Sequence, residues 1–353
     1  MKCLFYAGCN TDEYRQGIYS FVVDCDTGEF SQIGTAIETV DPIYLALNKA
    51  KTLLYSVETD PDLPAESNGC AVCYRLDGEV PRPVSRTRLE VPIPCYCALS
   101  DDERQLAWVD YRTAEFGVSL LNPDGTFQKS VCAHRLRNLG NGPSSPRQDS
   151  AHTHCAEFAP DNLLYVTDLG TDEILCATLS NDKFALLPKR SLKCRAGSGP
   201  RHILFHPSKS VLFLICELDN TVEVYSQVGT DRFMSIGCWP TLPVDFTGTS
   251  KCAALRISED GSHLFASNRG HDSIAVFHIN DDGSLDSPVI SRLNGSFPRD
   301  FELLPGEKFV VVGHKKSNEI QMYEFDKITG VLSAIHHPFP VHRPLVFKTG
   351  RTF

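Results

Sequence analysis

His154-Cys-Ala-Glu-Phe-Ala-Pro160 is the stretch of this 353-residue chain from which its fold can be worked out. It opens on an ionisable side chain six residues before a proline. The same spacing returns in Arg201-His-Ile-Leu-Phe-His-Pro207 and Arg299-Asp-Phe-Glu-Leu-Leu-Pro305. The three stretches indicate one structural unit that occurs three times. Their ionisable residues then hold one repeated position, and units arranged around an axis would bring them together.

A shorter pattern extends this repeat over the whole chain. In each copy a β-prone pair is followed two positions later by an aromatic or apolar residue, as in Val222-Glu-Val-Tyr225. Seven copies with a period near fifty residues are typical of a propeller. The copies begin at Ile18, Ala71, Val118, Ile174, Val222, Ile274 and Ile320, with separations of 53, 47, 56, 48, 52 and 46 residues.

Within each unit the residues favour three or four short strands. Polar turns such as Pro160-Asp161 alternate with apolar runs such as Leu212-Phe-Leu-Ile215, and helical periodicity is almost absent. We therefore predict an all-β fold: a seven-bladed β-propeller with four-stranded antiparallel blades, forming a single domain over residues 1–353.

The two ends of the chain are expected to meet in one blade. The first unit lacks the leading strand that the other units have, whereas Pro344-Leu-Val-Phe347 is a β-prone stretch after the seventh unit. We predict that this C-terminal strand completes the first blade and closes the ring, which removes an exposed sheet edge. The segments Asp60–Asn68 and Leu136–Ser150, rich in Pro, Ser and charge, are expected to be loops.

Composition narrows the class of protein. A net charge of −10 and a pI near 5.6 argue against a nucleic-acid surface and against an anionic-membrane anchor. The N-terminal stretch Met1-Lys-Cys-Leu-Phe-Tyr-Ala7 is too short and too quickly polar for a secretory signal, so fourteen cysteines indicate buried thiols in a reducing compartment. We expect a cytoplasmic protein that binds neither nucleic acid nor membrane. Composition leaves the oligomeric state open.

Two positions of the repeat are expected to lie at one mouth of the propeller. The start of a blade's first strand and the end of its second strand lie on the same face. One such residue would ordinarily be a solvated rim residue or half of a structural ion pair, with little effect on stability, but six related groups favour an active site. The first position holds His154, Arg201 and Arg299, and the second holds Glu217, Arg269 and Lys315.

These residue types suit an anionic substrate. Arginines offer planar, permanently charged forks for a phosphate or a carboxylate. His154 is the one group whose ordinary pKa permits proton transfer near neutral pH. Glu217 could orient that histidine, pair with an arginine or activate water.

Several stretches in the second half of the chain resemble the seven-bladed lactonase family, which includes bacterial-type 6-phosphogluconolactonases and fungal carboxymuconate-lactonising enzymes. In the first half of the chain, only the spacing of the expected strands is similar to that family. The matching stretches, in family order, are His152-Thr-His154, Asp168-Leu-Gly-Thr-Asp172, Gly199-Pro-Arg-His202, Glu217-Leu-Asp-Asn-Thr-Val222, Leu242-Pro-Val-Asp-Phe-Thr-Gly248, Ser267-Asn-Arg-Gly-His-Asp-Ser-Ile274 and Phe297-Pro-Arg-Asp-Phe301.

The resemblance implies a site and an activity. It implies a hydrolase that opens a phosphorylated sugar lactone, foremost 6-phosphogluconolactone of the pentose phosphate pathway. The alternatives are a carboxymuconate-type lactonising enzyme (a cycloisomerase) and a non-catalytic propeller that serves as an interaction scaffold. The implied catalytic residues are His154, Arg201, Glu217 and Arg269. We further predict that His152, His202, Arg299 and Lys315 bind the substrate.

Two other motifs carry weaker signals. The thiols of Cys70-Ala-Val-Cys73 would point to opposite faces of a strand, so we interpret them as buried structural cysteines. His152 and His154 would share a strand face, but no third ligand stands at a matching spacing, and we predict no metal. Since phosphate-loop, Walker-type and serine-elbow motifs are absent, we also predict no cofactor.

Overall fold

The computed structural model describes residues 1–11, 16–32, 36–78, 80–137, 140, 142–180, 183–229 and 232–353. Throughout these ranges the regular structure is strand, and the strands form seven separate antiparallel sheets. Each sheet has a path of four strands: in six sheets these follow one another in the sequence, and in the seventh the last strand of the chain joins the first three. Two sheets add one short strand. The predicted all-β fold with four-stranded antiparallel blades is confirmed. Over the described ranges no helix is long and apolar enough to cross a membrane.

The chain divides into two compact units. The C-terminal unit comprises Met1–Ala7, Phe21–Gln32 and Arg201–Phe353, and the N-terminal unit comprises Gly8–Ser20 and Ile33–Pro200. The single domain over residues 1–353 stays a prediction.

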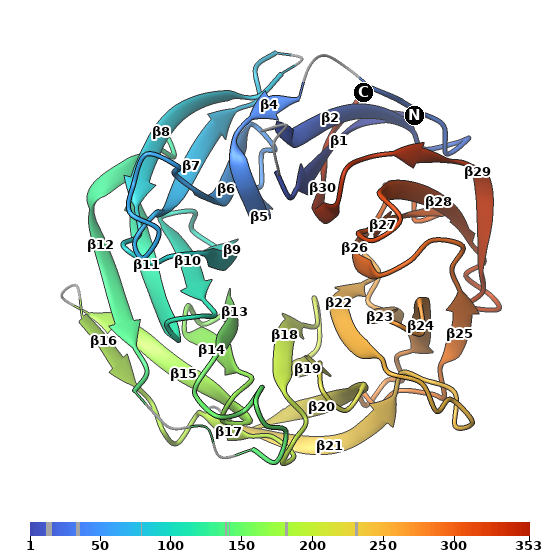
Figure 1. Cartoon of the computed structure of the whole chain (residues 1–353). Coiled ribbons are helices and arrows are strands. Elements are labelled where there is room, and N and C mark those ends of the chain that lie inside the picture. The colour runs from blue at the N-terminus through green and yellow to red at the C-terminus, as the bar shows by residue number, and fades with distance from the viewer. Residues whose placement is uncertain are drawn as a thin grey trace. The chain divides into compact units, whose positions relative to one another are not determined.

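Three blades belong to the N-terminal unit (Figure 1). Their strands are β5 (Val40–Leu47), β6 (Leu53–Thr59), β7 (Gly69–Arg75) and β8 (Arg82–Arg88); β9 (Pro94–Leu99), β10 (Gln105–Asp110), β11 (Glu115–Leu121) and β12 (Phe127–Arg135); and β13 (Thr153–Phe158), β14 (Leu164–Asp168), β15 (Glu173–Ser180), β16 (Lys183–Leu186) and β17 (Leu192–Lys193). The first strands of neighbouring blades pack together, β5 against β9 and β9 against β13. This packing places the starts of successive first strands side by side.

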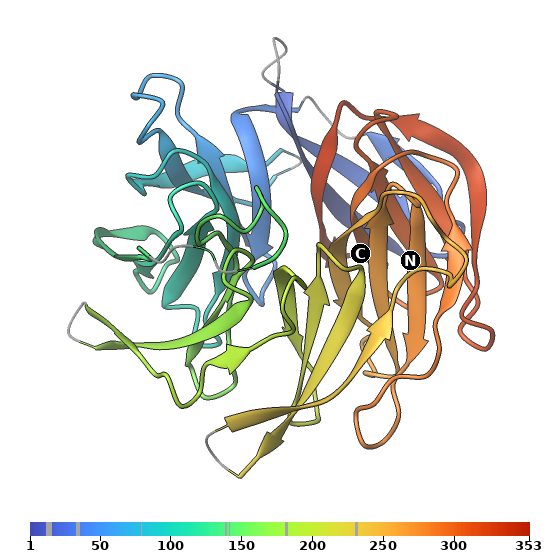
Figure 2. The same ribbon diagram turned by 60° about the horizontal axis from the view of Figure 1, so that its bottom comes forward.

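The C-terminal unit holds three more blades and most of the first (Figures 1 and 2). The strands of these sheets are β18 (Pro200–Phe205), β19 (Val211–Cys216), β20 (Thr221–Val228) and β21 (Arg232–Pro240); β22 (Lys251–Ile257), β23 (His263–Arg269), β24 (Ser273–His278) and β25 (Val289–Arg292); β26 (Pro298–Leu303), β27 (Phe309–His314), β28 (Glu319–Phe325) and β29 (Leu332–Pro340); and β1 (Lys2–Cys9), β2 (Gln16–Asp24), β3 (Phe30–Gln32) and β30 (Pro344–Thr352). The short strand β4 (Ile37–Glu38) pairs with the start of β2, and both of these segments belong to the N-terminal unit. Again β22 packs on β26, and β26 on β30.

The first blade is completed by the end of the chain, as predicted. Strand β30 pairs with β1 and runs beyond the predicted stretch to Thr352. The backbone N–H groups of Lys2 and Phe353 donate to each other's carbonyl oxygens, at 3.0 and 2.9 Å. The Phe347 ring stacks on Phe5 with centroids 5.3 Å apart. The C-terminal segment therefore gives β1 a hydrogen-bonded neighbour.

Burial explains why the middle strands are apolar along their whole length. Every residue of β19 and of β27 is buried, and each of these strands also packs on a strand of a neighbouring blade, β19 on β22 and β27 on β30. Buried side chains of β19, β20, β22, β23 and β24 form one continuous core cluster. The outermost strands β21 and β29, in contrast, have mostly exposed or half-buried side chains. The sheets thus stack through their faces and leave their outer edges to solvent.

The turn from the second to the third strand has the same construction in four blades. A non-glycine residue with positive φ stands two residues before the repeated isoleucine or valine. Asp and Asn tolerate this left-handed conformation better than most residues, which explains the polar turn in the sequence. The four residues are Asp172, Asn220, Asp272 and Asn318, with φ of 54°, 56°, 51° and 58°.

The predicted repeat needs a small correction in the first half of the chain. Ile174, Val222, Ile274 and Ile320 are each the second residue of a third strand, whereas Ala71 and Val118 are the third and fourth. These strands are buried along several consecutive positions, so an apolar pattern can slip along them. The predicted loop Asp60–Asn68 joins β6 to β7, and residues 138, 139 and 141 of the loop Leu136–Ser150 lie outside the described residues.

Candidate active site

The residues of the two predicted repeat positions lie at the starts of first strands and at the ends of second strands, as expected. His154, Arg201 and Arg299 are each the second residue of a first strand, in β13, β18 and β26. Glu217 and Lys315 directly follow the second strands β19 and β27. Arg269 is the last residue of the second strand β23.

A β-bulge marks the first of these positions. Thr153 pairs with Asp168 while Cys155 pairs with Thr167, so His154 is an extra residue in β13. On β26, Pro298 pairs with His314 and Asp300 with Gly313, which makes Arg299 the extra residue. A bulge bends the strand and re-aims the side chain at its extra residue. For His154 and Arg299, the shared spacing in the sequence thus corresponds to a shared irregularity of the backbone.

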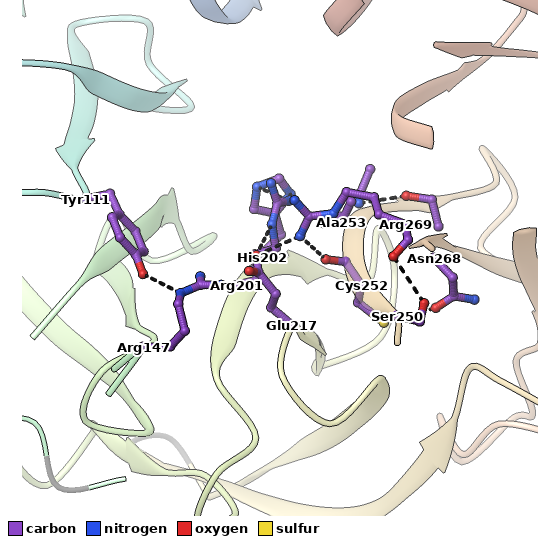
Figure 3. Close-up of polar contacts among 12 residues, drawn as sticks. Tyr111, Arg147, Arg201, His202, Glu217, Ser250, Cys252, Ala253, Asn268 and Arg269 are labelled. Carbon is purple, nitrogen blue, oxygen red and sulfur yellow. Dashed lines mark hydrogen bonds and ion pairs between the residues drawn. The ribbon is translucent and has the colours of Figure 1, made fainter. Parts of the chain in front are cut away.

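Two arginines and one glutamate form a buried cluster in the C-terminal unit, here called the Arg–Glu–Arg cluster (Figure 3). Oε2 of Glu217 lies 3.0 Å from Nε of Arg201 and 2.8 Å from Nη2 of Arg269. The exposed fractions of Arg201, Glu217 and Arg269 are 2%, 3% and 8%. One carboxylate thus faces two guanidinium groups, and the cluster carries one positive charge in excess.

Backbone carbonyls of β22 fix both guanidinium groups. Nη2 of Arg269 donates to the Cys252 carbonyl at 2.6 Å, and Nη1 of Arg201 donates to the Ala253 carbonyl. Successive carbonyls of a regular strand point to opposite sides. The pairing of β22 with β23 changes register after Cys252, and the Ala254 N–H is donated to Oγ of Ser267 at 3.0 Å. This bulge allows two successive carbonyl oxygens to accept hydrogen bonds from two neighbouring arginines.

Burial corrects the expectation that these are rim residues with little effect on stability. Arg201 is among the largest fully buried side chains of the described protein. A buried charge that loses its partner destabilises the fold strongly. Of the three roles considered for Glu217, pairing with arginines is the one for which the structure gives contacts.

Two aromatic rings extend the cluster. Nη1 of Arg201 lies 2.9 Å from Nε2 of His202, which is also buried. The guanidinium carbon of Arg269 lies 5.4 Å from the centroid of the Phe297 ring, within range of a cation–π interaction. His202 is therefore in direct contact with the predicted catalytic Arg201, and Phe297 is an additional neighbour of Arg269.

The predicted residues His152 and His154 lie in the N-terminal unit, where both rings contact Tyr111. The His152 ring stacks on the Tyr111 ring at 4.3 Å, and the His154 ring meets it edge-on at 5.8 Å. Nε of Arg147 donates to the Tyr111 hydroxyl at 3.1 Å. Asp168 accepts the His152 backbone N–H at 2.7 Å, and burial raises the pKa of this aspartate. His154 is 8% exposed, so its ring is held within the blade.

The last two predicted residues lie on the blade formed by β26 to β29. Lys315 lines a pocket of about 440 Å³ together with Phe297, Lys316, Asn318 and Arg343. Arg299 is half-buried on β26. The structure thus brings Arg201, His202, Glu217 and Arg269 into contact, and His152 and His154 into a second group. The meeting of these groups at one mouth stays a prediction.

The described residues contain no group of three or more His, Cys, Asp or Glu side chains that could hold a metal ion. His152 instead has contacts within the protein, because its Nδ1 lies 2.9 Å from the Tyr111 carbonyl oxygen and its Nε2 lies 3.2 Å from Oγ of Ser150. Cys70 and Cys73 are buried on β7, as the strand geometry predicted, and burial raises the pKa of both thiols.

The fold agrees with comparisons to known proteins. Residues 4–349 match the family model described as Lactonase, 7-bladed beta-propeller, so the chain belongs to this lactonase family and has its seven-bladed propeller fold. A 6-phosphogluconolactonase of Bacillus subtilis (strain 168) is 32% identical over 350 residues, which cover 96% of this chain and 97% of that protein.

Solved structures agree over nearly the full chain. A putative 6-phosphogluconolactonase from Bacteroides fragilis has a TM-score of 0.88 and 25% identity, covering 99% of this chain and 98% of its own. The periplasmic gluconolactonase PpgL of Pseudomonas aeruginosa has a TM-score of 0.90 at 24% identity, with 99% of both chains covered, and supports the fold.

Sequence reasoning missed Tyr111 and the role of Phe297. Tyr111 directly follows the second strand β10, which is the position that Glu217 and Lys315 hold in their blades. The repeat would have identified it if Phe116 instead of Val118 had been taken as the repeated residue. Phe297 stood in a matching stretch, but only the structure shows Arg269 beside its ring.

Proposed function

We propose that this protein is a lactone hydrolase and that its substrate is 6-phosphogluconolactone. The observation that carries the proposal is the buried Arg–Glu–Arg cluster, with its excess positive charge, in a chain of the lactonase family. The name of the Bacillus subtilis relative supports the choice of a phosphorylated substrate. A cytoplasmic setting would suit the buried cysteines.

The cluster is suited to polarise a lactone carbonyl. Guanidinium groups held by a carboxylate and by backbone carbonyls are oriented before substrate arrives, and oriented donors stabilise a developing oxyanion most effectively. Nε of Arg269 is buried and has no hydrogen-bond partner among the described residues, so it remains available as a donor. We assign Arg201 and Arg269 to the carbonyl oxygen, and Glu217 to positioning the two arginines.

Hydrolysis also requires a proton acceptor. Water adds to the lactone carbonyl carbon and loses a proton, then the bond to the ring oxygen breaks and that oxygen takes a proton. We propose that His154 accepts the proton from water and returns it to the ring oxygen, because imidazole exchanges protons near neutral pH. Its place at the same repeat position as Arg201 supports a shared substrate.

The test is hydrolysis of 6-phosphogluconolactone by the purified protein, with the spontaneous rate subtracted. We expect clear turnover, loss of turnover in His154→Ala, and a raised KM in Arg269→Ala. Arg82→Gln is the control, because Arg82 is an exposed partner of Asp77 on an outer strand and should keep normal kinetics. Equal rates with and without protein would remove the proposal. Full turnover in His154→Ala would assign the base to another residue.

A further inference from the structure

A basic pocket beside the Arg–Glu–Arg cluster has no assigned role. Its volume is about 440 Å³, within the range of small-ligand sites. Among the described residues, five line this pocket: three are cationic, one is an amide, one is aromatic and none is acidic. They are Phe297, Lys315, Lys316, Asn318 and Arg343. Such a concentration of positive charge is notable in a chain whose net charge is −10.

The backbone fixes the turns that carry these cations. The N–H groups of Lys315 and Lys316 donate to the carbonyls of Phe297 and Ser296, each at 3.1 Å. Oδ1 of Asn318 accepts the N–H of Arg343 at 3.0 Å. The turn after β27, the turn before β26 and the turn before β30 are therefore tied together, which prepares the pocket for a ligand.

Phe297 connects this pocket to the Arg–Glu–Arg cluster. Its ring centroid lies 4.6 Å from Nζ of Lys316 and 5.4 Å from the guanidinium carbon of Arg269. Each cation is attracted to the ring, but two cations that share one ring repel each other. An anion bound among Lys315, Lys316 and Arg343 would relieve that repulsion. Glu319, the nearby acid at the start of β28, is not among the residues that line the pocket.

We propose that this pocket is a phosphate subsite, which holds the phosphate end of a phosphorylated lactone. Two lysine ammonium groups, the planar Arg343 fork and the Asn318 amide are donors that suit a phosphate dianion. The subsite would determine the preference for a phosphorylated over an unphosphorylated lactone. The identity of the ligand rests on the proposed lactonase function, whereas the pocket is observed in the structure independently of that function.

The kinetic experiment compares two substrates in the full-length protein. In the double variant Lys316→Gln with Arg343→Gln, we expect KM for 6-phosphogluconolactone to rise by roughly 10- to 100-fold, the cost of lost charged hydrogen bonds. The constants for glucono-1,5-lactone should not change. Lys308→Gln, an exposed lysine on the same blade, is the matched control and should behave as wild type. An equal change for both substrates, or a change for neither, overturns the subsite.

A binding experiment separates this inference from the proposed function. Calorimetric titration with 6-phosphogluconate, gluconate and inorganic phosphate requires no turnover. We expect wild type to bind 6-phosphogluconate more tightly than gluconate, and the double variant to lose that preference. If no lactone is hydrolysed but the preference is present, the proposed function fails and the subsite stands. Loss of inorganic phosphate binding alone, with the preference intact, identifies a separate anion site and overturns the subsite.

Discussion

At the scale of single residues, the properties of the candidate site follow from buried charge. Arg201 and Arg269 both bind Oε2 of Glu217, so a single carboxylate attracts two buried guanidinium groups and offsets one of their two charges. The sequence could predict which residues share a repeat position. It could not predict that these three would be buried, because burial depends on the neighbouring blade. The roles of Phe297 and Arg343 were missed because these residues directly precede first strands, which is neither of the two repeat positions considered.

Glu217→Gln is predicted to cost much more stability than a similar change on the surface. Removing the carboxylate charge leaves two buried guanidinium groups facing each other, and breaking such a pair typically costs about 3–5 kcal/mol. Glu324→Gln is the control, since Glu324 is half exposed and 3.9 Å from Lys308, and should cost less than about 0.5 kcal/mol. Urea unfolding at pH 7 measures both. Similar losses in the two variants would contradict the structural role given to Glu217.

His314 is predicted to make stability depend on pH. It is fully buried, and burial lowers its pKa to about 4 from the ordinary 6.5. The unfolded chain takes up a proton below pH 6.5 while the folded chain does not. The stabilising contribution is therefore complete above pH 6.5 and is lost as pH falls towards 4.

Between pH 7 and pH 5 this one group should remove about 2 kcal/mol from the free energy of unfolding. His314→Gln has no imidazole to protonate at this position. Between pH 7 and pH 5, its free energy of unfolding should therefore fall by about 2 kcal/mol less than that of the wild type. Urea unfolding of both proteins at the two pH values gives the comparison. The same pH dependence in wild type and variant would show that His314 does not cause it.

At the scale of elements, β-bulges convert a regular strand into a site. They place His154 and Arg299 as extra residues and present the Cys252 and Ala253 carbonyls to two arginines. The sequence predicted the strands well, because their apolar runs are long. It did not predict the bulges, since a bulge is defined by the register between two strands and not by the composition of either strand.

Ser267→Ala is predicted to disturb the bulge in β22. Oγ of Ser267 accepts the buried Ala254 N–H, and an unsatisfied buried N–H costs about 1–3 kcal/mol. Ser119→Ala is the matched control, because Ser119 is equally buried and its Oγ has no partner among the described residues. Unfolding curves and lactone kinetics should both change in the first variant only. Equal stability of the two variants would mean that the bulge does not depend on this bond.

At the scale of the whole molecule, the fold was predictable because a repeat gives many observations of one unit. Seven copies near a fifty-residue period indicated seven blades, and the unpartnered C-terminal stretch indicated how the first would be completed. Substrate choice was less predictable, because the proposed phosphate subsite is formed by side chains such as Lys315 and Lys316, which other blades do not repeat although their turns have the same construction.

The completed first blade predicts an asymmetry between two phenylalanines near the end of the chain. Phe347 is fully buried and stacks on Phe5, whereas Phe353 is 64% exposed. Phe347→Ala should therefore remove about 3–5 kcal/mol from the free energy of unfolding, a large part of the 5–15 kcal/mol typical of a protein. Phe353→Ala should have little effect, because an exposed ring gains little from folding. Denaturant titration of both variants measures the difference.

Because β30 is hydrogen-bonded to β1 and packs on β26, loss of Phe347 should also expose the edge of β1 and promote aggregation at high protein concentration. If Phe347→Ala were as stable as Phe353→Ala, the C-terminal strand would not be what holds the first blade together.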